Sequence, residues 1–248
     1  MMNKIIKTNT LIFIFVAFMF CLSGTLYAQT NTSSVEILWE ADSYTPPFYK
    51  GKALKSGPST LSVTAMSHIY NETGSPIDAS TLYYKWYLGS RVLGGISGIG
   101  QNHVSIATSL RDDTIGVDVL SNDRETTYAK ANVIVTNTTP EVLLYYKNPL
   151  LGILFNSILS KNFPIKDREA ELVAFPLYFD SNNNNSSKLI YTWSINNERV
   201  KSGDGENSVI FQKIGEVEDS IISISIKNKE NVFQSTKSNF ILSLSNEN

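Results

Sequence analysis

The chain has 248 residues, of which 42% are hydrophobic, 11% aromatic and 18% charged, with a formal net charge of −2. This mildly acidic balance, without a basic run, gives no electrostatic footprint for nucleic acid or anionic lipid, so we set both aside as partners. The single cysteine, Cys21, lies close to the N-terminus. The rest of the chain therefore cannot contain a disulfide, a thiol nucleophile or a cysteine-rich metal site.

The first 28 residues have the pattern of a secretory signal peptide. Lys4 and Lys7 precede an apolar stretch at 11–22, which is shorter than the ~20 residues that a helix needs to cross a membrane. Ala28 is a small residue suited to cleavage, so we predict removal of residues 1–28 and export to the cell envelope or beyond it. The alternative is an uncleaved anchor, and only then do we expect membrane association.

The following segments alternate strand and turn signals. Residues 35–39 open a strand, and residues 61–65 alternate apolar with polar side chains, the period of a strand with one buried face. Further on, one side of a strand carries Tyr84, Trp86 and Leu88, which we assign to the structural core. The same parity recurs at Ile115, Val117 and Val119.

Turn-forming clusters at 71–76 and 94–98 separate these strands, as in an antiparallel sandwich. A break near 137–140 contains a proline and divides the chain into a first domain at 29–138 and a second at 139–248. So short a linker is expected to limit but not abolish relative domain motion.

The second domain repeats the first at an offset of roughly 105 residues, the size of one β-sandwich. Segment 82–88 recurs as 189–195, and the turn at 98–102 recurs as 203–207. The sequence thus predicts an all-β protein of two tandem antiparallel β-sandwiches. The second structural core is assigned to Tyr191, Trp193 and Ile195.

Two segments distinguish the second domain. The apolar run at 149–159 is expected to form a short helix or a buried crossover. The polar run at 180–187 is interpreted as a mobile hairpin loop. Within it Asp180, Asn182 and Asn184 alternate in a manner that permits calcium, but the glycine and glutamate of an EF-hand are missing. A solvated loop is favoured, and no cofactor is predicted.

The Tyr-x-Trp strand at 84–86, repeated at 191–193, resembles the core strand of immunoglobulin-like and PKD-like β-sandwich modules of exported bacterial proteins. The chain departs from antibody domains in lacking paired cysteines and a tyrosine corner. It also lacks the Asp-Phe-Gly-Asp-Gly-like loop of typical PKD domains. The resemblance implies adhesion, spacing or partner binding, although a fold does not by itself fix a function.

Catalytic side chains do not converge in the sequence. His68 and His103 are the two histidines, and Ser208 takes the place of His103 in the second repeat, as expected of a surface position. No serine lies in a nucleophile-elbow context, and the glycine clusters lack the spacing of a phosphate-binding loop. We therefore predict that the protein is not an enzyme.

The most suggestive exposed feature is an aromatic and proline-rich loop between the first two strands. A rigid aromatic surface is what a binding site for a glycan or a protein uses. The other interpretation, which we favour, is a crossover loop packed over the open end of the sandwich. The residues concerned are Tyr44, Pro46, Pro47, Phe48 and Tyr49.

The sequence as a whole predicts an exported, non-catalytic interaction or structural module with an envelope or extracellular protein partner. The alternative is a carbohydrate-binding protein that uses the aromatic loop of the first domain.

Overall fold

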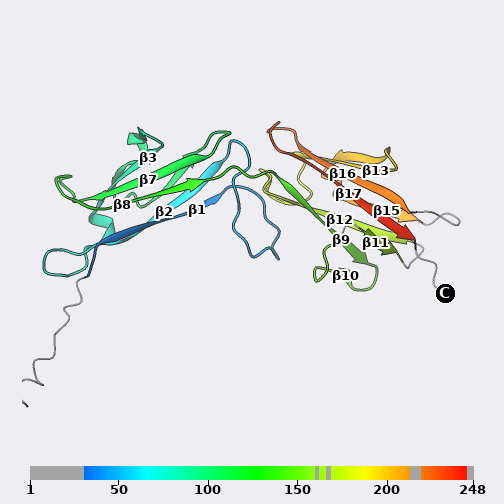
Figure 1. Cartoon of the computed structure of the whole chain (residues 1–248), viewed down its shortest axis with the longest axis horizontal. Helices are drawn as coiled ribbons and strands as arrows, with labels where there is room; N and C mark the ends of the chain where they lie inside the picture. The colour runs from blue at the N-terminus through cyan, green and yellow to red at the C-terminus, as the bar shows by residue number, and fades with distance from the viewer. Residues whose placement is uncertain (1–30, 160–161, 166–168, 213–218, 245–248) are drawn as a thin grey trace, which may run out of the picture.

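The computed structural model describes residues 31–159, 162–165, 169–212 and 219–244. These residues form two β-sandwiches that lie side by side along the long axis of the molecule (Figure 1). The signal peptide predicted over 1–28 lies outside the described residues. Within the described ranges, no helix is long and apolar enough to cross a membrane.

The first sandwich pairs two sheets. One has the strand order β1-β2-β6, formed by β1 (Ser34–Ala41), β2 (Thr60–His68) and β6 (His103–Ala107). The other has the order β4-β3-β7-β8, with β5 beside β3. Its strands are β3 (Tyr83–Leu88), β4 (Arg91–Val92), β5 (Gly98–Ile99), β7 (Asp113–Leu120) and β8 (Thr127–Val135). Two short 3-10 turns lie between them, η1 (Ala79–Thr81) and η2 (Gly94–Ile96).

The second sandwich repeats this plan, and the strands of one of its two sheets are longer than their counterparts. One sheet has the order β10-β9-β12-β15, formed by β9 (Glu141–Asn148), β10 (Gly152–Ile153), β12 (Glu169–Leu177) and β15 (Ser208–Gln212). The other has the order β11-β17-β16-β13-β14. Its strands are β11 (Asn162–Ile165), β13 (Leu189–Ile195), β14 (Glu198–Asp204), β16 (Ser220–Asn228) and β17 (Ser235–Leu244).

One strand pair departs from the antiparallel pattern. β11 runs parallel to β17, with Asn162 opposite Ile241, whereas the other described pairs are antiparallel. β10 belongs to one sheet and β11 to the other, so the chain changes sheets between them and meets the free edge of β17 in the same direction. A parallel edge pair of this kind has no signal in the alternation of side chains, because both directions share the period of two.

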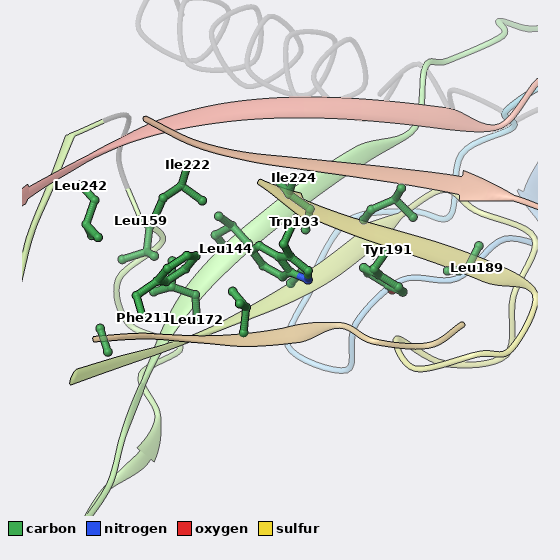
Figure 2. Packing of buried hydrophobic residues seen from close by; sticks show 14 of the residues in the cluster. Leu144, Leu159, Leu172, Leu189, Tyr191, Trp193, Phe211, Ile222, Ile224 and Leu242 are labelled. Atoms are coloured by element: carbon green, nitrogen blue, oxygen red, sulfur yellow. The ribbon is translucent and has the colours of Figure 1, made fainter. Parts of the chain in front are cut away.

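Alternation along the strands fills each core. In the first sandwich the inward side chains include Leu61 and Val63 on β2 and Val117 on β7, all almost completely buried. In the second, Figure 2 shows Trp193 between the two sheets, close to Ile224 and Leu144. Burial of such apolar surface is the main stabilising contribution in a chain of this kind.

The apolar run at 149–159 does not form the expected short helix. β9 turns into β10 at a tight hairpin, where the side-chain oxygen of Asn148 accepts the backbone N–H groups of Leu150 and Leu151 at 2.9 Å each. Gly152 follows with φ of 76°, which the turn requires. The expected buried crossover is also wrong at the tip, since the two leucines are 93% and 76% exposed. Further along the run, Ile153 packs against a buried cluster and Leu159 reaches the main core.

A tryptophan clamp recurs in both sandwiches. The indole N–H of Trp86 donates to the carbonyl of Gln101 at 2.8 Å, and that of Trp193 donates to the carbonyl of Glu206 at 3.0 Å. Each buried ring thus satisfies its one polar group on the turn that leads into the next strand of the opposite sheet, β6 or β15.

The turn held by each tryptophan contains a glycine in the left-handed region. Gly100 has φ of 69° and Gly205 has φ of 66°. Their N–H groups donate to the carbonyls of Leu82 and Leu189, at 2.9 Å in both cases. The repeated Gly-x-Gly segments are therefore turns whose backbone conformation requires glycine, rather than phosphate-binding loops.

Candidate functional site

The loop between β1 and β2, residues 42–59, leaves the first sandwich and contacts the second (Figure 1). The N–H of Tyr44 donates to the carbonyl of Phe179 at 2.7 Å, and the N–H of Tyr178 donates to the carbonyl of Tyr44 at 3.0 Å. These two bonds form an isolated antiparallel bridge between segments that are far apart in the sequence. We call residues 42–59 the junction loop.

Phe48 is the apolar anchor of the junction loop. Its ring lies 4.5 Å from the ring of Phe155 and 5.2 Å from those of Tyr145 and Phe175, centroid to centroid. Tyr145 and Phe175 belong to β9 and β12 of the second sandwich and are almost completely buried. Edge-to-face aromatic pairs of this kind are worth about 0.5 to 1.5 kcal/mol each beyond the burial of area.

Tyr49 and Tyr178 join the two sandwiches by their hydroxyls, which lie 2.6 Å apart. Burial raises the pKa of Tyr178, and the hydrogen bond with Tyr49 raises it further. Tyr178 also has φ of 64°, in the left-handed region that residues other than glycine rarely adopt. Pro46 is buried in the same turn, where its carbonyl accepts the N–H of Tyr49 at 2.9 Å.

A second set of contacts holds the C-terminal half of the junction loop. The buried side chain of Gln234 donates to the carbonyl of Ser56 at 2.9 Å and accepts from the amide of Asn228 at 2.8 Å. Asn231 donates from its side chain to the carbonyl of Pro58 at 3.2 Å. These amides come from the β16–β17 turn, so the loop touches the second sandwich at two separate places.

The junction loop is fixed on its own sandwich by a buried ion pair. The ammonium of Lys55 is fully buried, 2.9 Å from the carboxylate of Asp113, and also donates to the carbonyl of Arg111. Ser109 donates to both oxygens of the same carboxylate. The carbonyl of Lys55 accepts the N–H of Thr138 at 2.8 Å, which ties the loop to the linker as well. Burying a charge is costly unless it is paired and hydrogen-bonded, as both partners are in this ion pair.

An open cleft of about 1070 Å³ lies where the junction loop meets the second sandwich. Both sandwiches contribute to it, and it brings together the two sequence features that stood out, the aromatic loop and the polar run at 180–187. The first sandwich contributes Asp42, Ser43, Tyr44, Thr45, Pro47 and Phe48, and the second contributes Phe155, Phe175, Ser181, Asn182, Asn183 and Asn184.

The polar wall of the cleft is neutral apart from Asp42. The polar run at 180–187 is fixed by two hydrogen bonds to its backbone. The hydroxyl of Tyr191 donates to the carbonyl of Asn184, and the hydroxyl of Ser181 donates to the carbonyl of Asn183 at 3.3 Å. Burial raises the pKa of Tyr191 and of Tyr44. Both phenols are therefore neutral at physiological pH, and the cleft keeps a single charged side chain.

The residues assigned to the core lie inside the two sandwiches. Tyr84, Trp86, Tyr191 and Trp193 have no exposed surface, while Leu88 and Ile195 are half-buried against the same clusters. Of the aromatic loop, Pro46 is buried, Pro47 is exposed, and the three rings Tyr44, Phe48 and Tyr49 are half-buried at the junction. The loop therefore packs against the second sandwich instead of covering the open end of the first.

Sequence reasoning missed the partners of the aromatic loop. Phe155 and Phe175 lie more than 100 residues further along the chain, and nothing in the local pattern links them to Phe48. The one available signal is the polar run at 180–187, which the sequence predicts to be a mobile hairpin loop. In the structure its residues 181–184 line the cleft together with the aromatic loop.

The remaining candidate groups are dispersed. The exposed His103 shares a 2.8 Å hydrogen bond with the hydroxyl of Thr64. The carboxylate of Asp180, considered for calcium, lies 3.9 Å from the ammonium of Lys188. Among the described residues, no three or more His, Cys, Asp and Glu side chains gather in a group that could hold a metal ion.

No family model and no curated protein match the chain. Solved structures that are similar include the three N-terminal domains of the Highly Immunogenic Outer Capsid protein (Hoc) of bacteriophage RB49, at 13% identity and a TM-score of 0.42 over 86% of this chain. The chain spans 59% of the length of that structure.

Two further similar structures are built of comparable modules. The fibronectin(III)-like modules of Clostridium thermocellum CbhA match 84% of this chain and 94% of their own at 11% identity, with a TM-score of 0.27. Immunoglobulin domains 1–4 of Sidekick-1 match 85% of this chain and 66% of their own at 11% identity, with a TM-score of 0.28. The class of the chain follows from its own strands and sheet orders, which make it an all-β protein of tandem immunoglobulin-like β-sandwiches.

Proposed function

We propose that this protein is a non-catalytic interaction module whose two sandwiches act as one unit. The observation that carries the proposal is the junction loop, which belongs to the first sandwich in sequence and packs against the second in space. Two-domain chains joined by short linkers move relative to each other unless their interface holds them. Here the interface contains aromatic packing, a backbone bridge and buried amide hydrogen bonds.

A fixed junction gives the protein a composite surface that neither sandwich has alone. The cleft is lined from both sides, so its shape depends on the relative placement of the domains. Interaction proteins gain affinity when their binding surfaces are organised before the partner arrives. This supports a role in partner binding or adhesion over a role as a simple spacer.

We further propose that the module works at the cell envelope or outside the cell. The support is the sequence of residues 1–28, with Lys4 and Lys7 before an apolar stretch and a small residue at the expected cleavage point. The partner is expected to be an envelope or extracellular protein.

Chemical crosslinking in intact native cells tests the proposal directly. The protein is then purified, and mass spectrometry identifies both its N-terminus and its crosslinked neighbours. We expect a chain that begins at Gln29 and a recurrent envelope-protein neighbour. A chain that retains Met1 would contradict cleavage, and a cytosolic set of neighbours would contradict export.

The second candidate function is carbohydrate binding. The observation that favours it is that Tyr44, Pro47 and Phe48 line an open cleft, in which part of their surface stays accessible. Clefts with aromatic walls and a few polar groups are typical ligand sites.

A further inference from the structure

We infer that the cleft at the junction binds a short neutral oligosaccharide, with Phe48 and Phe155 on one side of the sugar and the side-chain amides of Asn182 and Asn184 on the other. This inference rests on the proposed function, because it needs the two sandwiches in fixed relative positions. It names the ligand class, and it adds residues of the second sandwich as determinants of binding.

The apolar wall suits the carbon face of a sugar ring. Phe48 and Phe155 lie with their centroids 4.5 Å apart and their planes 36° from parallel, so the two rings stack on each other at a tilt and leave their outer faces and edges to the cleft that both line. Phe155 is 46% exposed and Phe48 is half-buried, which leaves both rings accessible from the cleft. A pyranose presents C–H groups on one face and hydroxyls at its rim, so it can cover such a surface without burying its polar groups.

The polar wall suits the hydroxyls. A side-chain amide both donates and accepts, as a sugar hydroxyl does. Within the described residues, the amides of Asn182, Asn183 and Asn184 make no intramolecular hydrogen bond. They are therefore available to a ligand, while the backbone that carries them is fixed by Tyr191 and Ser181.

The charge of the cleft selects against acidic ligands. Asp42 is the one charged side chain among the lining residues, and no lysine, arginine or histidine is among them. Among the lining residues, a phosphorylated, sulfated or uronic ligand would meet a carboxylate and no cation, which disfavours it. The nearby ammonium of Lys188 is already shared between Glu230 at 2.9 Å and Asp180 at 3.9 Å. A neutral ligand is also consistent with the neutral phenols of Tyr44 and Tyr191.

An extended peptide fits the cleft less well than a sugar. Peptides commonly bind sandwich proteins by adding a strand to a free edge, which requires unpaired backbone groups. At this cleft the N–H and the carbonyl of Tyr44 are already bonded to Phe179 and Tyr178. The groups that remain accessible are side-chain amides and ring faces, which recognise a sugar more readily than a main chain.

The test measures saccharide binding to the protein in the form in which its native cells produce it, after purification. The probes are neutral tetrasaccharides of glucose, mannose and N-acetylglucosamine, with a tetrasaccharide of galacturonic acid as the acidic comparison, all by isothermal titration calorimetry. We expect at least one neutral probe to bind and the acidic probe not to bind. The double variant Asn182→Ala/Asn184→Ala should weaken the bound probe about tenfold or more, as the loss of one to two hydrogen bonds implies.

The matched control is Asn185→Ala. Asn185 is an exposed amide in the same polar run but lies outside the lining of the cleft, so its loss should leave the affinity unchanged. Both variants should unfold at the denaturant concentration of the parent protein, because the three side chains make no internal hydrogen bond.

Three outcomes would overturn the inference. The first is that no neutral probe binds up to roughly 10 mM, the weak end of specific affinities. The second is that Asn185→Ala weakens saccharide binding as much as the double variant does. The third is that the cleft selects peptides instead of sugars from a displayed library. If crosslinking finds a protein partner while the saccharides fail, the interaction module stands and the sugar site falls. If the sugars bind and no protein partner is found, the two sandwiches still act as one unit, and the ligand of the module is a saccharide instead of a protein.

Discussion

The two sandwiches share a core and differ in what the chain does between their first two strands. In both, a buried tryptophan bonds to a glycine-containing turn, with nearly equal distances. In the first sandwich, the segment between β1 and β2 becomes the junction loop and packs against the neighbouring domain. In the second, the segment between β9 and β12 forms the β10 hairpin and the parallel edge strand β11 of its own sandwich, and its Phe155 ring meets Phe48 of the junction loop.

This contrast indicates where a repeated fold can change. The clamp positions lie between the sheets, where any change of volume is felt, whereas the inserted segments lie at the sandwich ends, where their length and packing can differ. The junction is thus made from the variable part of the first domain. The following predictions separate what the sandwiches share from what only one of them has.

The largest effect is expected for the shared clamp. Trp86→Ala and Trp193→Ala should each lower the free energy of unfolding by about 4 kcal/mol, because each removes a fully buried ring and leaves a cavity. Denaturant unfolding followed by circular dichroism measures this. Trp39→Ala is the control, since that ring is only half-buried, with the ammonium of Lys52 lying 3.3 Å from its centroid. Equal losses in all three variants would contradict the special role of the clamp.

The buried ion pair is expected to matter in the first sandwich alone. Lys55→Met leaves the carboxylate of Asp113 buried without its cation and should cost about 3 kcal/mol. Lys188→Met removes a partly exposed partner of Glu230 and should lower the free energy of unfolding much less than Lys55→Met, because solvent screens this pair. Chemical denaturation of both variants gives the comparison, and similar values for the two would refute it.

The two glycines of the clamp should differ from each other. A Cβ on Gly205 would lie 2.3 Å from the carbonyl oxygen of Asn185, whereas one on Gly100 would lie 3.1 Å from that of Ser80. Both also carry the penalty of a left-handed backbone. We expect Gly205→Ala to cost about 2 kcal/mol or more and Gly100→Ala about 1 kcal/mol in thermal unfolding.

Gly94→Ala is the control for the glycine pair. That glycine has no neighbour within 4 Å of the added carbon and does not have a left-handed φ, so its melting temperature should stay near that of the parent. The account of the turns fails if Gly100→Ala proves more destabilising than Gly205→Ala.

A substitution at the junction is expected to lower the free energy of unfolding less than the changes described so far. Tyr49→Phe removes the hydroxyl that meets Tyr178 at 2.6 Å and should cost about 1 kcal/mol while leaving each sandwich intact. Relaxation of backbone amides by NMR should then show a shorter correlation time for each domain. Unchanged tumbling in this variant would mean that the other contacts suffice.

The smallest effect is a dependence on alkaline pH. The folded-state pKa of Tyr178 is raised by burial and by the bond with Tyr49, so the folded protein holds this proton more tightly than the unfolded chain. The resulting stability is present below the unfolded pKa of about 10 and is lost as the pH rises above it. Between pH 9 and 11, the free energy of unfolding should therefore fall more steeply with pH for the parent than for Tyr178→Phe. The difference between the two should begin at about the ordinary tyrosine pKa.

Local patterns were enough to predict the strands and the cores. Ile222 and Ile224 alternate with serine, and Trp193 repeats Trp86 in its context, so period and repeat together indicated two sandwiches. The alternation depends only on residues within a few positions of one another, and the repeat is visible when two segments of the same chain are compared.

The junction was beyond such reasoning. The contacts of Phe48 with Phe155 and Phe175 depend on how two domains are placed, which no local period encodes. The prediction for the hairpin at Leu150 was wrong for a different reason. An apolar run suggests burial, whereas the turn of this hairpin is set by the single side chain of Asn148. The parallel direction of β11 likewise left no trace in the sequence.

The central claim is that the junction loop holds the two sandwiches in one relative orientation. Residual dipolar couplings of backbone amides, measured on the weakly aligned protein, test it most directly. If the claim is correct, the couplings of β1–β8 and those of β9–β17 fit one alignment tensor in the described arrangement. Two tensors of different magnitude would show domains that move independently, and the composite cleft would then lose its basis.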